Sequence, residues 1–467
     1  MPLGHDFSGE GGRCTRCSRT EEELYPGVSS YAEKAQLMDS TFAPDSNGTA
    51  ANMGKLVFGK KTDGTASQEW YILGKDTGVS GENTVIFAAN SIKNESGNEL
   101  AFETDYDINK TDTLLWNDCK YNGTNPTEVY PNHYGASELR DTLQEMATSN
   151  FTAAEQSMMN ATTVTTRDAM NDADYTTTDK LYALTADSYD PSSELRNTIV
   201  KAGSNDQISL AMNPYWNENI SGGGFWLRAP FNDNSDPYNR EKALCASLHN
   251  YVYYNPVYVG YDVRPVGNLN LSSVLFASAA TASYDTAAAG TIPSDKAMTL
   301  RLDGSDKKLG IVINYAKTGE IKATKGDTTG TVSLVVQGRE GTKDWYYSKP
   351  ITGTETVKAS DIQSELSSSA NIDLSACKIW LETTGEDGMI YAVNAYKGTE
   401  KINTTYTTKE QLMNSFTPYS DGTVVNTGKL VFGKNNEGTS QEWYILGKDD
   451  GVAGENTIIF AASPVKN

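Results

Sequence analysis

The chain has 467 residues, of which 38% are hydrophobic and 21% are charged, and this length predicts two to four domains in a soluble, loop-rich protein. Sixty acidic residues against 39 basic ones give a net charge of -21, which disfavours binding to nucleic acid or to an anionic membrane surface because both would repel it. No apolar run approaches the roughly 18 residues that span a bilayer, so we expect no direct membrane insertion.

Residues 1–30 show no export signal, since no basic region is followed by an apolar stretch. Cys14 and Cys17, with His5 upstream, have the spacing of a partial zinc ribbon, but these three ligands are one short of a complete zinc site. We therefore interpret the segment as the remnant of an upstream module and predict neither a metal site nor another cofactor. The five cysteines of the whole chain are too scattered for a disulfide framework.

Short apolar runs bounded by Gly and Asp predict three strands, in residues 54–60, 67–76 and 81–89. Their sequences are GKLVFGK, SQEWYILGKD and GENTVIFAA. These strands open the first predicted domain, which we expect to cover residues 31–275.

Two short helices are predicted next. Ser137 precedes Leu139, Leu143 and Met146 at helical spacing, and residues 152–155 have the pattern of a capping box. The chain that follows is rich in Thr, Asn, Asp and Ser, which indicates long irregular connections.

Two framework strands enclose a tyrosine-rich stretch near the end of this domain. Residues 222–230 (GGGFWLRAP) and 261–271 (YDVRPVGNLNL) are the strands, and residues 232–258 lie between them. Tyr supplies large, stiff contact area and Asn supplies adaptable hydrogen bonds, a composition typical of antibody paratopes. We predict a recognition surface for an unknown protein or glycan ligand. The alternative is an Asn-rich loop followed by a strand whose tyrosines pack half in and half out.

The candidate ligand-binding residues share this polar or aromatic character and are Trp216, Asn232, Asn234, Asp236, Tyr238, Asn239, His249, Tyr251, Tyr253, Tyr254 and Tyr258.

Small, poorly periodic residues at 276–290 predict a linker. Beyond it, about seven strand signals within residues 291–402 and no long helical pattern favour an all-β immunoglobulin-like sandwich. We expect Trp380 and Cys377 in its core, and a spacer role without a site of its own.

The end of the chain repeats its beginning. GKLVFGK, SQEWYILGKD and GENTIIFAA return within residues 403–467, at an offset of about 373 residues. This is far longer than a solenoid repeat, so the repeating unit is itself multidomain. The second copy lacks counterparts of Leu139, Phe151, Trp226 and Val263, which we expect to cover the strands of the first copy. We therefore expect a slice of a longer tandem array, with a C-terminal segment that is loosely held or pairs with a neighbour.

The order LVFG, EWYILG, IFAA, SELRDTL, FTAAEQ, FWLRAP and VRPVGNLNL resembles an uncharacterised domain of bacterial surface proteins in the C-type-lectin-like and sulfatase-modifying-factor superfamily. The resemblance implies a compact α+β domain, followed here by the sandwich and a partial repeat of the lectin-like domain. Asp262 departs modestly from the family's closing phrase, which has Gly before Val-Arg-Pro. Trp226, Arg228, Arg264 and Pro265 are interpreted as framework.

From these features we expect a non-enzymatic ligand-binding or adhesion protein at the cell surface or outside the cell. One alternative is a structural or phage-associated surface protein, and the resemblance also admits a variable protein diversified by a retroelement. A second alternative is an enzyme of the sulfatase-modifying-factor fold. Those enzymes use a cysteine-rich site, whereas Cys245 has no cysteine near it in this sequence.

Overall fold

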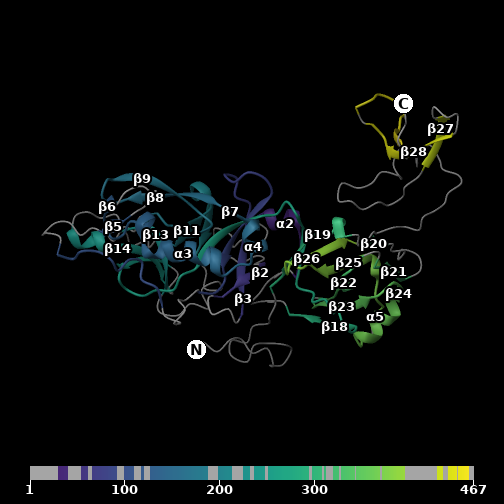
Figure 1. Cartoon of the computed structure of the whole chain (residues 1–467), viewed down its shortest axis with the longest axis horizontal. Coiled ribbons are helices and arrows are strands. Elements are labelled where there is room, and N and C mark those ends of the chain that lie inside the picture. The colour runs from purple at the N-terminus through teal and green to yellow at the C-terminus, as the bar shows by residue number, and fades with distance from the viewer. Residues whose placement is uncertain are drawn as a thin grey trace. The chain divides into compact units, whose positions relative to one another are not determined.

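The computed structural model describes residues 30–39, 54–61, 66–91, 99–109, 117–119, 127–187, 198–212, 224–231, 236–247, 251–293, 297–307, 310–311, 319–325, 328–341, 343–368, 371–394, 429–434, 440–449 and 451–461. These residues form a β-rich fold with only four short α-helices (Figure 1). None of the described helices is long and apolar enough to cross a membrane. The chain divides into two compact units, Met1–Ala279 with Pro293–Leu302 and Glu386–Met389, and Ala280–Ile292 with Asp303–Gly385 and Ile390–Asn467.

An antiparallel sheet lies at the centre of the first unit. Its strand order is β10 (Leu181–Ala183), β16 (Pro265–Asn270), β4 (Asn83–Ala88), β3 (Ser67–Gly74) and β2 (Lys55–Lys60), and β7 (Met159–Asn160) also pairs with β16. All six residues of β4 are buried, as expected for an apolar strand covered on both faces. The three strands predicted near the start of the chain are confirmed, and β16 lies beside β4 although far from it in sequence.

Both predicted helices are present. The Ser137 hydroxyl accepts the backbone N–H of Arg140 at the start of α3 (Glu138–Ser149), whose buried face includes Leu139, Leu143 and Met146. The capping box of α4 (Ala153–Met158) is complete, with Thr152 and Glu155 each accepting a backbone N–H from the other. Local capping chemistry therefore begins both helices where the sequence predicted.

The segment expected to be irregular contains two hairpins. Strands β8 (Thr162–Asp168) and β9 (Ala173–Asp179) pair along their whole length. Strand β11 (Ile199–Ala202) pairs with β12 (Ile208–Ala211), and the 3-10 helix η4 (Ser204–Asp206) lies in the connection between them. Thr162, Val164 and Thr166 alternate with less buried neighbours in β8, so threonine carries part of the buried face. For residues 162–179 and 199–211, the expectation of an irregular connection is wrong, because Thr-rich alternation supports a strand as well as a turn.

The remaining described elements of the first unit are short. They include the hairpin β5 (Asn117–Cys119) with β6 (Thr127–Val129), the 3-10 helix η3 (Tyr134–Ala136), and helix α2 (Lys34–Met38). Strand β17 (Val274–Ser278) pairs on one side with β1 (Tyr31–Glu33) and on the other with β19 (Thr299–Asp303).

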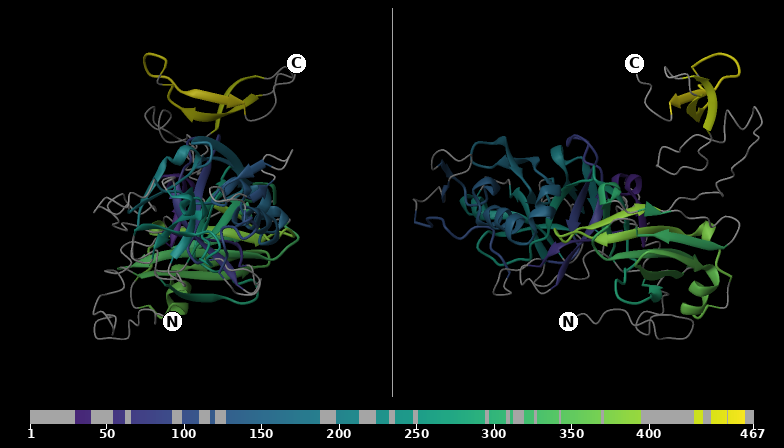
Figure 2. Two further views of the ribbon diagram at one scale, coloured as in Figure 1. Left: turned by 90° about the vertical axis from the view of Figure 1, so that its left-hand side faces the viewer. Right: turned by 45° about the vertical axis from the view of Figure 1, so that its right-hand side comes forward.

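Within residues 280–394, the described part of the second unit contains strands of two antiparallel sheets. One has the order β26 (Ile390–Asn394), β25 (Lys378–Thr384), β22 (Val332–Glu340), β23 (Lys343–Ile351) and β18 (Ala288–Ile292), and the other has the order β20 (Gly310–Ile311), β21 (Glu320–Thr324) and β24 (Thr354–Lys358). The right-hand view of Figure 2 shows these strands in teal to yellow-green and the short helix α5 (Ala359–Glu365) in green. Two 3-10 helices, η7 (Ser305–Lys307) and η8 (Leu374–Ala376), belong to the same part of the unit.

The apolar core of the second unit joins the two sheets. Leu334 and Leu381 come from the larger sheet, Ile321 and Val357 from the smaller one, and Cys377 is part of the same buried cluster. Trp380 is also fully buried, but it lies outside this cluster because it alternates with Ile379 and Leu381 along β25. Its indole N–H donates to the carboxylate of Glu382.

Two expected boundaries differ from the structure. The expected linker at 276–290 contains the end of β17 and the start of β18, since its small side chains allow extended pairing. The strand β19, expected to open the sandwich, pairs with β17 and groups with the first unit. Alternation alone identifies a strand and does not name its neighbour.

The second copy of the repeat forms a three-stranded antiparallel sheet, the C-terminal sheet, of β27 (Lys429–Lys434), β28 (Ser440–Gly447) and β29 (Ile458–Ala461). It is coloured yellow in Figure 1. Its local strand order matches β2–β3–β4.

Candidate functional site

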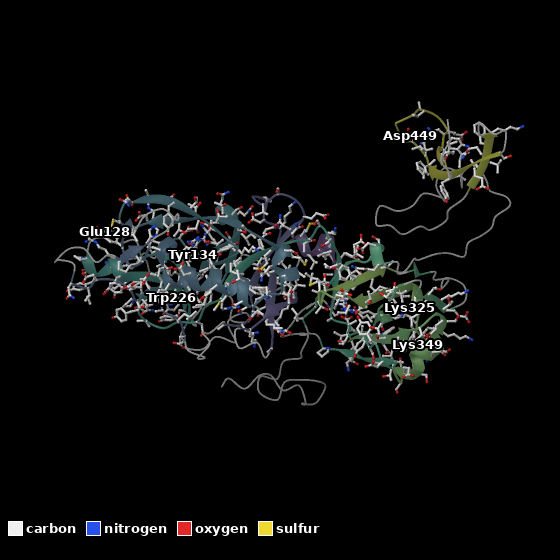
Figure 3. All side chains as sticks on the ribbon, viewed as in Figure 1. Glu128, Tyr134, Trp226, Lys325, Lys349 and Asp449 are labelled. Atoms are coloured by element: carbon white, nitrogen blue, oxygen red, sulfur yellow. The ribbon has the colours of Figure 1, made fainter. Side chains whose placement is uncertain are left out.

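The predicted recognition surface is carried by a small sheet of the first unit. Strand β14 (Lys242–Ser247) lies between β13 (Gly224–Pro230) and β15 (Val252–Pro256), and the 3-10 helix η6 (Pro237–Glu241) leads into β14. Trp226 of β13, labelled in Figure 3, is fully buried, and its indole N–H donates to the Leu100 carbonyl at 2.9 Å. Trp226 also makes edge contacts with Phe102 and Tyr261, at 5.6 and 5.0 Å between ring centroids. Packed aromatic side chains therefore fix the strand that starts this sheet.

Four aromatic rings form a row on this sheet. Tyr254 stacks on the buried ring of Phe231 at 4.0 Å between centroids and on Tyr253 at 4.9 Å, and Tyr251 meets Tyr253 edge-on at 6.3 Å. The Lys242 ammonium lies 5.2 Å from the centre of the Tyr254 ring. Stacking holds the tyrosines in fixed orientations, so a ligand that binds them meets a surface with little side-chain entropy left to lose.

Exposure divides this row and its surroundings. Tyr238, Tyr253 and Tyr258 are 68%, 38% and 55% exposed, whereas Tyr251 and Tyr254 are half-buried. The predicted alternative, tyrosines that pack half in and half out, therefore describes Tyr251 and Tyr254, and the other three present their rings to solvent.

Two polar residues predicted for ligand binding have structural duties. Asp236 caps η6, because its side chain accepts the backbone N–H of Tyr238 at 3.0 Å. Asp236 is nevertheless exposed to solvent. Asn239 is buried, and its side-chain oxygen accepts from the Lys242 ammonium at 3.0 Å. The assignment of Asn239 to direct ligand contact is therefore corrected, because its side chain is turned into the protein. Of the other candidates, Trp216, Asn232, Asn234, His249, His5, Cys14 and Cys17 lie outside the described residues.

Tyr106 joins the site and was not singled out from the sequence. Its hydroxyl donates to the Glu241 carboxylate at 3.1 Å. Burial, together with the charge and hydrogen bond of Glu241, raises the pKa of Tyr106 above its usual range, and Tyr258 contributes electrostatically. Tyr106 therefore stays protonated at neutral pH and holds η6 in place. No local motif marks this partnership, since 135 residues separate its two members.

Cys245 lies inside β14, where it is 1% exposed. Burial raises the pKa of its thiol to about 11, although a hydrogen bond from Asn255 opposes the shift. At neutral pH the sulfur is therefore a thiol, which is a much weaker nucleophile than a thiolate.

The two framework arginines are buried and held by backbone carbonyls. Arg264 donates to Ala88 and Ala89, at 2.9 and 3.2 Å, and stacks 4.3 Å from the centre of the Phe87 ring. Burial lowers its pKa to about 10. Arg228 donates to the Ala183 carbonyl at 2.9 Å and pairs with the Asp206 carboxylate. These contacts agree with the framework interpretation.

A buried carboxylate, Asp76, forms a second polar cluster. Its oxygens accept the backbone N–H of Ser204 at 2.7 Å, the Ser204 hydroxyl at 2.5 Å and the backbone N–H of Gly78 at 2.9 Å, and the Gln207 amide also donates to it. Four donors satisfy this carboxylate, so it joins the β3–β4 turn to the β11–β12 hairpin. The sequence signal for it was the Lys-Asp-x-Gly turn, which occurs in both copies of the repeat.

The second unit has a small cavity of about 230 Å³, and residues that line it include Arg339, Trp345, Ile372, Asp373 and Cys377. Gly338 lies directly beneath the Trp345 ring, where a Cβ atom would come within 2.1 Å of it. The cavity is smaller than the roughly 300–1,000 Å³ of ordinary ligand pockets. It therefore offers space for only a few solvent-sized groups.

Among the described residues, no three His, Cys, Asp or Glu side chains come together in an arrangement that would hold a metal ion. Protein-family models, curated proteins and solved structures contain no match to this chain.

Proposed function

We propose that the first unit is a ligand-binding module of a surface-exposed or secreted protein, and that its recognition surface includes Tyr238, Tyr253 and Tyr258. The observation that carries the proposal is the exposure of these three rings along the segment that runs from η6 through β15 to the turn after it, next to strands that hold the buried Trp226 and Cys245. Exposed tyrosines supply rigid contact area and a polar hydroxyl in the same side chain, as protein and glycan recognition both require.

The resemblance to lectin-like surface domains supports the same function. In that interpretation, Trp226, Arg228 and Arg264 maintain the fold, and the tyrosine-rich segment is the part that varies in chemistry. The second unit serves as a β-sandwich spacer of immunoglobulin type, and the protein is non-enzymatic. The excess of acidic residues favours ligands that are neutral or basic over phosphate-rich ones.

The test is binding of the full chain to arrays of glycans and of extracellular proteins. Tyr253→Ala and Tyr258→Ala are each expected to weaken binding of an array ligand by about tenfold, the loss typical of an interface hot spot. Tyr346→Ala is the matched control, since Tyr346 is a half-buried tyrosine of β23 in the second unit.

An unchanged affinity in both recognition-surface variants, measured on chains that unfold at the wild-type temperature, would contradict the proposal. A loss of binding that only accompanies a loss of folding would assign the tyrosines to the core.

A further inference from the structure

The C-terminal sheet reproduces the hydrogen bonds of its first copy. The indole of Trp443 donates to the Phe432 carbonyl at 2.6 Å, as the indole of Trp70 donates to the Phe58 carbonyl at 2.7 Å. Asn456 also repeats the turn chemistry of Asn83. Its oxygen accepts from the Asp449 N–H at 2.7 Å, and the equivalent bond in the first copy is 3.0 Å. The sheet is thus formed to the same local pattern as its first copy. Asp449 is labelled on it in Figure 3.

The two copies differ in what covers them. Phe58 and Phe87 are 3% and 1% exposed, whereas their counterparts Phe432 and Phe460 are 68% and 61% exposed. Ile458, which corresponds to the fully buried Val85, is also exposed. Apolar side chains that are core in one copy are therefore surface in the other, and exposed groups of this kind mark interaction sites.

The first copy shows what fits this surface. Strand β16 lies antiparallel along β4, with Val266 opposite Phe87 and Asn268 opposite Val85. Arg264, just before β16, donates to the Ala88 carbonyl and stacks on the Phe87 ring. The Asn268 amide donates to the Asn83 oxygen at 3.1 Å. Strand pairing, the cation–π contacts of Arg264 and one buried amide bond thus hold β16 beside β4.

Each group that receives these contacts has a counterpart in the C-terminal sheet. Phe460 corresponds to Phe87, Ala461 to Ala88 and Asn456 to Asn83. In the described part of the chain, β29 pairs only with β28, so its other edge corresponds to the edge of β4 that β16 occupies. An edge strand with its pairing groups and its apolar side chains presented together is suited to strand addition.

We propose that the C-terminal sheet is an acceptor for one added strand, which takes the place beside β29 that β16 takes beside β4. The occupant is an extended segment with the chemistry of residues 261–271, in which an arginine precedes a strand of small, apolar and amide side chains. It adds antiparallel to β29, places its guanidinium over Phe460 and donates an amide to Asn456. The surface assigned here is separate from the tyrosine surface and does not depend on its function.

The experiment uses the full chain and a labelled synthetic peptide with the sequence of residues 261–271. Saturable binding is expected by fluorescence anisotropy, together with slower amide hydrogen exchange in residues 458–461. The Arg264→Ala peptide is expected to bind about tenfold more weakly, because it loses both the stacking contact and the carbonyl bonds. The Phe460→Ala chain should lose about as much affinity for the original peptide.

The matched control is the Phe432→Ala chain. Phe432 is as exposed as Phe460 but lies on β27, at the far side of the sheet from β29, so its removal should leave peptide affinity within about twofold. The absence of saturable binding would overturn the proposal. Binding that is equally sensitive to Phe432→Ala and Phe460→Ala would overturn it as well, because it would indicate general adhesion to exposed apolar groups. A dimer of the chain that requires Phe460 and that the peptide does not displace would identify a second copy as the occupant instead.

Discussion

Strands β2–β4 and strands β27–β29 share nearly the same sequence and the same local hydrogen bonds, yet one set is core and the other is exposed. In the first copy, the Phe151 ring packs on Phe58 at 5.4 Å between ring centroids, and the Phe225 ring packs on Phe87 at 6.0 Å. Neither phenylalanine has a counterpart in the repeated sequence. The comparison shows that about 40 residues suffice to specify a strand order and a turn, whereas burial is supplied by residues far away in the chain.

Gly59 shows how close the covering layer comes. Its φ of 71° lies in the left-handed region, and an added Cβ atom would come within 2.4 Å of the Phe151 ring. The counterpart Gly433 has nearly the same φ, 75°, but would meet nothing within 4 Å. The backbone conformation is thus retained where the packing that also requires glycine is absent.

Amide hydrogen exchange should show the largest difference between the two copies. Amides of Val85–Ala88 are expected to exchange at least about a hundredfold more slowly than those of Ile458–Ala461, because core strands open with nearly the global free energy and uncovered strands open locally. Mass spectrometry of the exchanging full chain reports both segments in one sample. Equal protection would show that the C-terminal sheet is covered in solution and would contradict the comparison.

Truncation of equivalent phenylalanines should separate the copies energetically. Phe87→Ala is expected to lower the free energy of unfolding of the first unit by about 3–5 kcal/mol, the usual cost of deleting a buried phenylalanine. Phe460→Ala should change the free energy of unfolding by no more than about 0.5 kcal/mol, as surface substitutions do. Urea unfolding of the full chain, followed by pulsed hydrogen exchange, assigns each transition to its unit. A similar loss in both variants would mean that Phe460 is buried in solution.

Acid should act on the first unit through His133. This residue is 2% exposed and stacks on Tyr175 at 4.1 Å, and burial lowers its pKa from 6.5 to about 4, although the Asp168 carboxylate opposes the shift. The unfolded state therefore binds more protons between these values. The contribution of neutral His133 to the free energy of unfolding is therefore complete above pH 6.5 and is lost as the pH falls to about 4. This contribution is on the order of 3 kcal/mol, at 1.36 kcal/mol per pKa unit.

Urea unfolding between pH 7.5 and pH 4 measures this effect. The His133→Gln chain is expected to show a shallower pH dependence than the wild type in that window. The C-terminal sheet repeats no residue equivalent to His133, so its exchange should not share the effect. A wild-type slope that persists in the variant would assign the acid sensitivity to other groups.

The two equivalent turn aspartates provide the finest comparison. Asp76→Ala leaves the buried donors of Ser204 without their acceptor and is expected to cost about 1–3 kcal/mol of stability. Asp449 accepts the Gly451 N–H at 2.9 Å in a more exposed turn, and Asp449→Ala should cost about 0.5 kcal/mol or less. Thermal unfolding of the two variants checks the order. A larger loss for Asp449→Ala would reverse the assignment of Asp76 as the buried anchor.

Much of the local structure was predictable because the deciding interactions are short in sequence. Ser137 and Thr152 begin their helices through bonds that span three residues, and the strands of the repeat follow from apolar runs between glycine and aspartate. The β8–β9 hairpin was missed because threonine is compatible with both turns and strands. The tyrosine-rich composition of the candidate site could be read from the sequence, but the inward turn of Asn239 and the bond from Tyr106 to Glu241 could not.

The sequence by itself determined the helix caps and the turns of the repeat, because their hydrogen bonds span about ten residues at most. The turn bonds recur in both copies. The tertiary structure alone decided which faces are covered. Because side chains alternate along β25, Trp380 points to the opposite face of the sheet from Ile379 and Leu381. The alternation does not say which of the two faces packs into the core of the second unit. Phe58 and Phe432 make the same point, since identical local sequences acquire opposite environments. Burial depends on the partner that a face meets, and that partner is chosen by contacts between residues distant in the chain.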